Sequence, residues 1–143
     1  MRLKAMAKIN LGLDVLGKRE DGYHEVRMIM QTIRMYDILD IRKTRRPGIV
    51  LTTNLPFIPT DQRNLVYKAA QMLMEEFDVE EGLSIKLRKF IPVAAGMAGG
   101  SSDAAAAFVG VNRMFHLGLT EEQLMERAVK VGADVPYLSL IHI

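Results

Sequence analysis

Apolar and polar residues alternate in the first part of the chain. From Ile9 to Val15 every second position is Ile, Leu or Val, and the positions between them are polar or glycine. This period of two predicts a half-buried strand, with Lys8 and Asn10 together on its polar face. The Asp21-Gly22 pair that follows predicts a turn.

Further short apolar or alternating segments predict more strands. These segments run through Val26–Met30, Ile38–Arg42, Ile49–Thr53 and Leu83–Leu87. Pro47-Gly48 interrupts the pattern before Ile49 and predicts a break between two strands. Residues 54–63 contain two prolines and have no regular period, which predicts a loop.

Apolar residues spaced by three and four positions predict helices in the second half. One helix is expected from Leu65 to Phe77, with Asn64 as its N-cap and an end at Glu80-Glu81-Gly82. A second is expected from Ser102 to Phe115. A capping box over residues 120–123 starts a third, which runs through Lys130. This order of elements predicts an α+β fold, with an antiparallel-rich sheet and helices packed on one side.

Composition narrows the possible functions. The 143 residues suit one domain, and the absence of cysteine excludes a disulfide framework or a thiolate zinc site. The three histidines lack metal-ligand spacing, and a net charge of +2 gives little support for nucleic acid as a partner. No apolar run reaches about 18 residues, and no signal peptide is evident, so we expect a cytoplasmic protein without a membrane partner.

A glycine-rich segment between the last strand and the second helix carries the strongest chemical signal. It reads Pro92-Val93-Ala94-Ala95-Gly96-Met97-Ala98-Gly99-Gly100-Ser101-Ser102-Asp103-Ala104. Glycine lets backbone N–H groups approach an oxyanion, and the positive end of a helix that Ser and Asp open also favours an anion. The segment therefore predicts a phosphate cradle. The alternative is a tight turn at which a helix packs close to a sheet.

Two common phosphate-binding motifs do not fit this segment. No lysine follows Gly99 or Gly100, which excludes a Walker A loop. The glycine spacing and the order of elements also differ from a dinucleotide-binding fingerprint. A different type of phosphate loop is needed, with its cationic partner elsewhere in the chain.

The segment resembles the ATP-binding loop of the GHMP kinases, which include galactokinase and the homoserine, mevalonate and phosphomevalonate kinases. Residues 7–11, Ala-Lys-Ile-Asn-Leu, resemble the first motif of the same family. The resemblance implies the N-terminal domain fold of these kinases, which is of the ribosomal protein S5 domain 2-like type. It also implies ATP with Mg²⁺ bridging the phosphates, and Ser102 as a contact for the metal ion.

Two more stretches narrow the resemblance within the family. They are residues 17–25, which contain Asp21-Gly22-Tyr23-His24, and the Asp134-Val135-Pro136 triplet. Together they are similar to the branch that phosphorylates the 2-hydroxyl of 4-diphosphocytidyl-2-C-methyl-D-erythritol in the non-mevalonate (MEP) pathway to isoprenoid precursors. The resemblance therefore implies an ATP-dependent small-molecule kinase whose substrate carries a cytidine diphosphate group.

The resemblance assigns Lys8 and Asp134 to the catalytic pair. Asp134 would accept the proton from the attacking hydroxyl. Lys8 would keep that carboxylate ionised and stabilise charge on the transferring phosphoryl group. Without the resemblance, Lys8 would be interpreted as a solvent-facing strand lysine and Asp134 as a turn residue.

Other residues are assigned to ligand contacts by the same resemblance. Tyr23 and His24 would hold the cytosine base, by a stacking face and by ring nitrogens, and an exposed hairpin turn is the alternative. Asn10 would orient the sugar-alcohol end of the substrate. Asn64 and Lys89 would lie near the adenine and ribose of ATP, although Asn64 is already explained as a helix cap.

The C-terminal residues depart from the family pattern. The family continues past Asp-Val-Pro with a glycine-rich strand and a second domain, whereas residues 138–143 are largely apolar and contain no glycine. We expect residues 1–137 to be the N-terminal ATP-binding domain and residues 138–143 an atypical tail, with the second domain absent. The sequence leaves the oligomeric state and the activity of such a chain open.

Two alternative functions remain. One is another GHMP-type kinase, of the homoserine or mevalonate class, against which Asp21-Gly22-Tyr23-His24 argues. The other is a non-catalytic RNA-binding module of similar fold. The near-neutral charge and the pairing of Lys8 with Asp134 argue against it.

Overall fold

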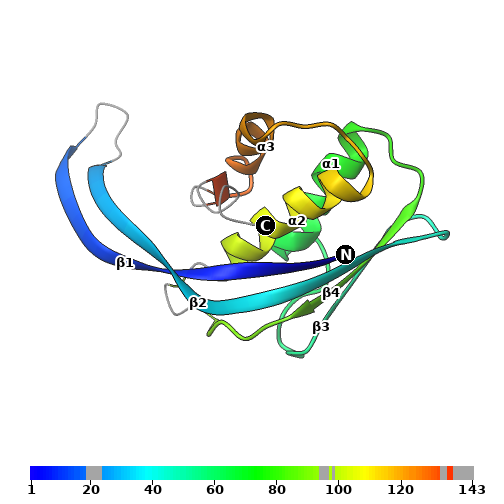
Figure 1. The fold of residues 1–143 in the computed structure, drawn as a ribbon, viewed down its shortest axis with the longest axis horizontal. Coiled ribbons are helices and arrows are strands. Elements are labelled where there is room, and N and C mark those ends of the chain that lie inside the picture. Colours follow the sequence, from blue (N-terminus) through cyan, green and yellow to red (C-terminus); the bar gives the residue numbers. More distant parts are fainter. Residues whose placement is uncertain (19–23, 94–96, 98, 133–134, 137–143) are drawn as a thin grey trace.

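The computed structural model describes residues 1–18, 24–93, 97, 99–132 and 135–136, and for residues 9–31 it describes no side chains. The elements are β1 (Arg2–Lys18), β2 (His24–Thr44), β3 (Ile49–Thr53), α1 (Leu65–Glu76), β4 (Gly82–Arg88), α2 (Gly99–Met114) and α3 (Glu121–Ala128). Figure 1 shows a strongly curved sheet with the helices on one of its faces. The predicted α+β fold, with helices on one side, is confirmed.

The strand order of the described sheet is β1-β2-β4-β3. β1 pairs antiparallel with β2, and β2 pairs antiparallel with β4, which confirms an antiparallel-rich sheet. β3 pairs with β4 in parallel, because the chain passes through α1 between these two strands and returns in the same direction. β4 is therefore internal, and its C-terminal end delivers the glycine-rich segment from the middle of the sheet.

The strands predicted at Val26–Met30 and Ile38–Arg42 form one continuous strand, β2, so their division into two strands is wrong, whereas the break predicted at Pro47-Gly48 separates β2 from β3. The register with β1 shifts between the two predicted segments of β2, because Met6 lies opposite Tyr36 whereas Lys8 lies opposite Thr32. The two positions from Met6 to Lys8 on β1 thus lie opposite the four positions from Tyr36 to Thr32 on β2. This irregularity is of the β-bulge type. Because a bulge changes the face that a side chain occupies, the alternation along the sequence is interrupted although the strand continues.

The predicted N-caps of α1 and α3 are confirmed. Asn64 Oδ1 accepts a hydrogen bond from the Val66 N–H at 2.9 Å, and Thr120 and Gln123 form the reciprocal capping box. α1 ends earlier than predicted, because Asp78 adopts a φ of 49° two residues after the helix. α2 and α3 end within two residues of their predicted ends.

The start of α2 differs from the prediction. The helix begins at Gly99, so the prediction that Ser102 and Asp103 open it is wrong. Their side chains have other partners: Ser102 Oγ donates to the carbonyl oxygen of Met6 at 2.6 Å, and Asp103 accepts from the Lys89 ammonium at 2.6 Å. These tertiary contacts override the local preference of Ser and Asp for capping. The glycine pair therefore occupies the first two positions of the helix, where N–H groups have no partner within the helix.

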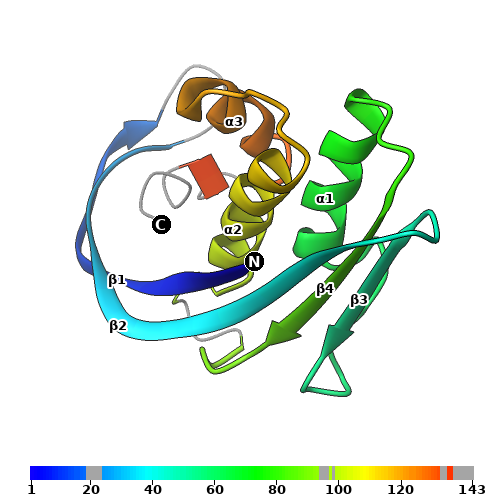
Figure 2. The same ribbon diagram turned by 45° about the vertical axis from the view of Figure 1, so that its right-hand side comes forward.

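α2 is the central helix of the core. It packs against β1 and β2 on one side and against α1 on the other, as Figure 2 shows. The run Ala104–Ala107 is fully buried, and such small side chains let a helix approach a sheet closely. The sheet and the helix bury large apolar side chains between them, including Leu3, Leu39, Ile41, Leu83, Ile85, Leu87 and Phe108.

Gly110 lies where α2 packs closely on the sheet, and we expect it to be sensitive to substitution. A Cβ at this position would lie 2.6 Å from both Leu3 Cδ1 and Ile41 Cδ1. For Gly110→Ala we expect a net loss of about 1 kcal/mol, because overpacking costs typically about 2 kcal/mol and the gain in helix propensity offsets about 1 kcal/mol.

Thermal unfolding tests this expectation, with a midpoint that falls by about 3–6 °C. Gly100→Ala is the control, because the nearest atom to its Cβ would be Leu65 Cδ1 at an ordinary 3.8 Å. An unchanged or raised midpoint for Gly110→Ala would mean that the two sheet side chains move aside without cost.

Candidate functional site

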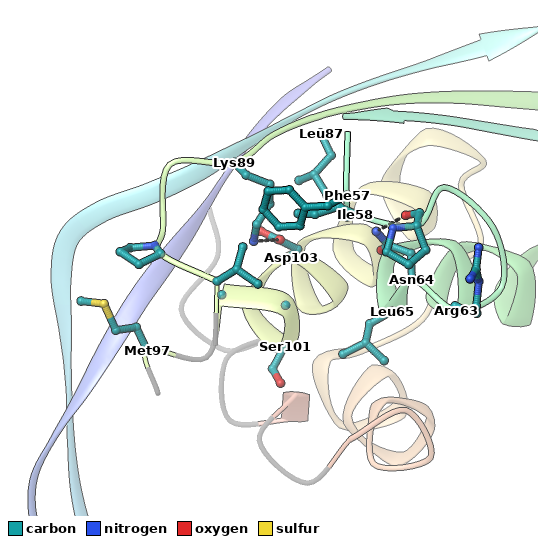
Figure 3. A pocket seen from close by; sticks show the side chains of 15 residues that line it. Phe57, Ile58, Arg63, Asn64, Leu65, Leu87, Lys89, Met97, Ser101 and Asp103 are labelled. Carbon is teal, nitrogen blue, oxygen red and sulfur yellow. Dashed lines mark hydrogen bonds and ion pairs between the residues drawn. The ribbon is translucent and has the colours of Figure 1, made fainter. Parts of the chain in front are cut away.

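A cavity of about 490 Å³ opens beside the start of α2, in the size range of small-molecule sites. The loop at residues 54–63, the end of β4 and the starts of α1 and α2 form its walls (Figure 3). Its lining combines apolar side chains with the glycine-rich segment and a few polar groups: Phe57, Ile58, Pro59, Arg63, Asn64, Leu65, Leu87, Lys89, Pro92, Val93, Met97, Gly99, Gly100, Ser101 and Asp103. The predicted phosphate loop and an apolar wall thus share one cavity.

The start of α2 supplies the anion-binding part of this cavity. Gly99, Gly100 and Ser101 form the first turn of the helix and line the cavity. The N–H groups in a first turn have no partner within the helix, and the helix dipole adds positive potential there. The turn can therefore bind an oxyanion through its main chain, as the glycine content predicts.

The two serines of the loop have different surroundings. Ser101 lies on the cavity wall, whereas Ser102 is fully buried and its hydroxyl donates to Met6 on β1. A magnesium contact at Ser102 stays a prediction, and of the two serines only Ser101 is among the cavity-lining residues. Among the described residues, no group of three or more acidic or histidine side chains is placed to hold a metal ion.

Lys8 is buried, with 5 % of its surface exposed. The interpretation of Lys8 as a solvent-facing strand lysine is therefore wrong. Its backbone N–H donates to the carbonyl oxygen of Met97 at 3.1 Å, and Met6, two residues earlier, accepts from Ser102. β1 thus binds the glycine-rich segment on both sides of the register shift and holds Lys8 beside it.

Lys89 joins β2 to α2 through a buried pair of carboxylates. Its ammonium donates to Asp37 Oδ2 and to Asp103 Oδ2, both at 2.6 Å, and each side chain in the cluster is at most 6 % exposed. Asp37 Oδ1 also accepts from the N–H groups of Phe90 and Ile91, at 2.6 and 2.9 Å. The segment that leaves β4 is therefore fixed to β2 immediately before the glycine-rich loop.

Burial has the largest effect on the pKa values of Lys89 and Asp103. Burial raises the pKa of Asp103 well above its ordinary value. Lys89 lowers that pKa in part, and the neighbouring Asp37 raises it further. Burial acts to lower the pKa of Lys89, but the two carboxylates together outweigh it, so the pKa is raised. Asp103 Oδ1 has no hydrogen-bond partner among the described residues, which adds to the cost of ionising this carboxyl group.

The loop at residues 54–63 is a part of the site that the sequence did not predict. Asn54 binds the main chain of Lys89 in both directions, since its amide donates to the Lys89 carbonyl at 3.1 Å and its oxygen accepts from the Lys89 N–H at 2.7 Å. The Asn64 amide donates to the Pro59 carbonyl at 2.9 Å. Phe57 lines the cavity although 70 % of it is exposed. The available signal was the pair of apolar residues, Phe57 and Ile58, between two prolines in a loop.

The polar side-chain groups of Asn64 and Lys89 already have hydrogen-bond partners within the chain. Asn64 caps α1 and holds the preceding loop, while Lys89 is held by its two carboxylates. Both residues still line the cavity, so their proposed closeness to adenine and ribose stays a prediction.

Several predicted site residues lie outside the described part of the structure. These are Ala94, Ala95, Gly96 and Ala98 of the loop, Tyr23 and Asp134. Asn10 and His24 belong to β1 and β2, but their side chains are also outside it. The distance from Lys8 to Asp134 and the cytosine contacts therefore stay predictions. In the described helices, no segment is long and apolar enough to cross a membrane.

Known proteins of similar sequence were compared with the chain. Residues 64–140 match the family model described as the GHMP kinases N terminal domain. The chain is 56 % identical over 137 residues to 4-diphosphocytidyl-2-C-methyl-D-erythritol kinase of Caldicellulosiruptor bescii, and 56 % identical over 138 residues to that of Lachnoclostridium phytofermentans. Each match covers 96 % of this chain, with 48 % and 47 % of the relative. The chain thus spans about half the length of these curated relatives.

Solved structures give the same picture of the fold. A crystal structure of 4-(cytidine 5'-diphospho)-2C-methyl-D-erythritol kinase matches with a TM-score of 0.85 at 35 % identity, over 98 % of this chain and 49 % of that one. The homoserine kinase from Cytophaga hutchinsonii matches with a TM-score of 0.70 at 17 % identity, over 92 % of this chain and 40 % of that one. The second likeness concerns the fold alone.

The raised pKa of Asp103 predicts a pH-dependent gain in stability when this carboxyl is replaced. A folded-state pKa above the unfolded value favours folding below the unfolded pKa, and this contribution is lost as the pH rises through the folded pKa. At pH 7 we therefore expect Asp103→Asn to be more stable than wild type by roughly 1 kcal/mol, since the amide can accept from Lys89 and donate to Asp37. The gain should shrink as the pH falls toward 4.

Thermal unfolding between pH 4 and 8 measures this difference. Asp61→Asn is a control of opposite sign, because the hydrogen bond from Arg63 lowers the pKa of the exposed Asp61 to about 2. Its loss should reduce stability slightly at pH 7, and the reduction should stay nearly constant between pH 8 and 4, because it disappears only as the pH falls below 4 toward that value. A lower midpoint for Asp103→Asn at pH 7 would contradict the expectation.

Proposed function

The chain belongs to the GHMP kinase family, and on this premise we propose that it serves in the ATP-dependent phosphorylation of the 2-hydroxyl of 4-diphosphocytidyl-2-C-methyl-D-erythritol. The observation that carries the proposal is the cavity in which the glycine-rich first turn of α2 meets an apolar wall. The choice of substrate is supported by the names of the relatives that are 56 % identical to the chain.

The two parts of the cavity suit the two parts of ATP. Phe57, Leu65 and Leu87 offer apolar surface for the purine ring, which is uncharged. Gly99 and Gly100 offer main-chain N–H groups at the positive end of a helix, which suit the phosphates. Mg²⁺, when bound, would offset the charge of the phosphates, and the Ser101 hydroxyl on the cavity wall would be placed to hold it.

Lys8 and Asp134 are the proposed catalytic pair. Lys8 is buried beside the glycine-rich segment, where a low local dielectric strengthens the effect of its charge. In this position it would keep the Asp134 carboxylate ionised and stabilise the phosphoryl group in transfer. Asp134 would accept the proton of the attacking hydroxyl. The oxygen of that hydroxyl forms the new bond to phosphorus as the bond to ADP breaks.

The acceptor side of the site is proposed to include Asn10, Tyr23 and His24. Asn10 follows Lys8 on β1 by two positions, at the middle of the long β1–β2 pair. His24 is the first residue of β2, at the far end of the same pair, and Tyr23 precedes it in the sequence. Tyr23 would stack on the cytosine ring and His24 would bind its polar edge.

An ADP-release assay tests this function. With ATP, Mg²⁺ and 4-diphosphocytidyl-2-C-methyl-D-erythritol, we expect ADP release above the rate seen with mevalonate or homoserine. Lys8→Met should lower this release by about 100-fold or more, because it removes transition-state stabilisation, and should change ATP affinity little.

Lys4→Met is the matched control for Lys8→Met. Lys4 is an exposed lysine on the same strand, with its ammonium over the Tyr36 ring, so turnover should stay within about twofold of wild type. Equal turnover with mevalonate would overturn the choice of substrate. Failure of the wild-type chain to bind ATP would overturn the assignment of the cavity.

A further inference from the structure

Lys89 lines the cavity, but its ammonium is already paired with two carboxylates. The ammonium is 2.6 Å from a carboxylate oxygen of Asp37 and 2.6 Å from one of Asp103, and the side chain is 6 % exposed. The main chain of Lys89 is also fixed, by the two hydrogen bonds to Asn54. A lysine held at both ends in this way is poorly placed to move toward a ligand.

The lysine head lies directly beneath the first turn of α2. A Cβ on Gly99 would be 3.2 Å from Lys89 Nζ and 3.1 Å from Ile91 Cγ2. Gly99 therefore packs on the ammonium and on Ile91, which lies two residues after Lys89. Asp103, one turn further along α2, binds the same ammonium, so both ends of this turn contact Lys89.

The cluster also sets the charge next to the proposed phosphate site. Asp103 lies about 6 Å along the helix axis from Gly99, at four residues and 1.5 Å per residue. An uncompensated carboxylate this close to the helix start would oppose the binding of phosphate, because it cancels the positive potential of the dipole. Lys89 offsets that carboxylate and, through Asp37, fixes the turn to β2.

We propose, on the basis of the ATP site proposed above, that Lys89 is a positioning residue for the phosphate-binding turn of α2. It acts through Asp103 and Gly99 and makes no contact with the nucleotide base. It neutralises the carboxylate behind the first-turn N–H groups, so that these groups keep their positive potential for phosphate.

The decisive measurement compares ATP with adenosine, which has the same base and ribose but no phosphate. Lys89→Met keeps the aliphatic stem that lines the cavity and removes the ammonium. We expect calorimetric titration of the 143-residue chain to give an ATP affinity reduced by about tenfold or more and an adenosine affinity reduced by less than about threefold. A purely structural defect, or a lost contact to the base, would reduce both affinities alike and overturn the proposal.

A second substitution tests the route through Asp103. In Lys89→Met combined with Asp103→Asn, the carboxylate that the lysine offsets is also removed. We expect the ATP affinity to return to within about threefold of wild type. Lys86→Met is the matched control, because Lys86 is an exposed lysine on β4, three residues before Lys89. Neither the ATP affinity nor the adenosine affinity should change.

The double variant also tests the proposal if Lys89→Met alone does not fold. Circular dichroism would show whether each variant is folded. A folded double variant with near wild-type ATP affinity supports the proposal. A double variant that is unfolded, or that is folded but binds ATP no better than Lys89→Met, overturns it. If wild type itself binds no ATP, the proposed function fails instead, so the two failures are distinguishable.

Discussion

The buried ion pair of Lys89 with Asp37 and Asp103 is the interaction on which the site depends. It links β2, the end of β4 and α2 at the place where the chain leaves the sheet and enters the glycine-rich loop. Burying such charges is costly unless they are paired, and removal of the shared ammonium, which would leave two buried carboxylates without it, typically costs about 3–5 kcal/mol. The cluster therefore specifies one position for the start of α2. The protein keeps this arrangement although an apolar cluster of the same volume could be equally stable.

The rest of the phosphate-binding turn is held by main-chain and hydroxyl contacts. Met97 and Ser102 bind the backbone of β1 at Lys8 and Met6, where the register with β2 shifts. The register shift between β1 and β2 thus lies beside the glycine-rich loop, which forms hydrogen bonds to the backbone of β1 at this point. As a result, a buried Lys8 and the glycine N–H groups are presented together, each on a rigid element, as an electrostatic site requires.

The cavity itself is assembled from segments of different kinds. The glycine-rich loop and Asn64 were predicted from sequence as phosphate loop and helix cap, and both line the cavity. Its outer wall comes from Phe57 and its neighbours, in a loop without any period. Asp37 could have been noticed, because it shares the strand face of the buried Leu39 and Ile41, where a carboxylate is out of place. Nothing in the sequence pairs it with Lys89.

The sequence by itself determined the types of element, the N-caps of α1 and α3 and the phosphate loop, because each depends on residues within a few positions of one another. The tertiary structure decided where α2 begins, which serine faces the cavity and what Lys89 binds. These features depend on contacts between residues that are distant in sequence: Lys89 reaches Asp37 across 52 positions, and Ser102 reaches Met6 across 96. Local preferences for capping or exposure yield to such contacts, because a buried charge or hydroxyl must find a partner wherever the fold provides one.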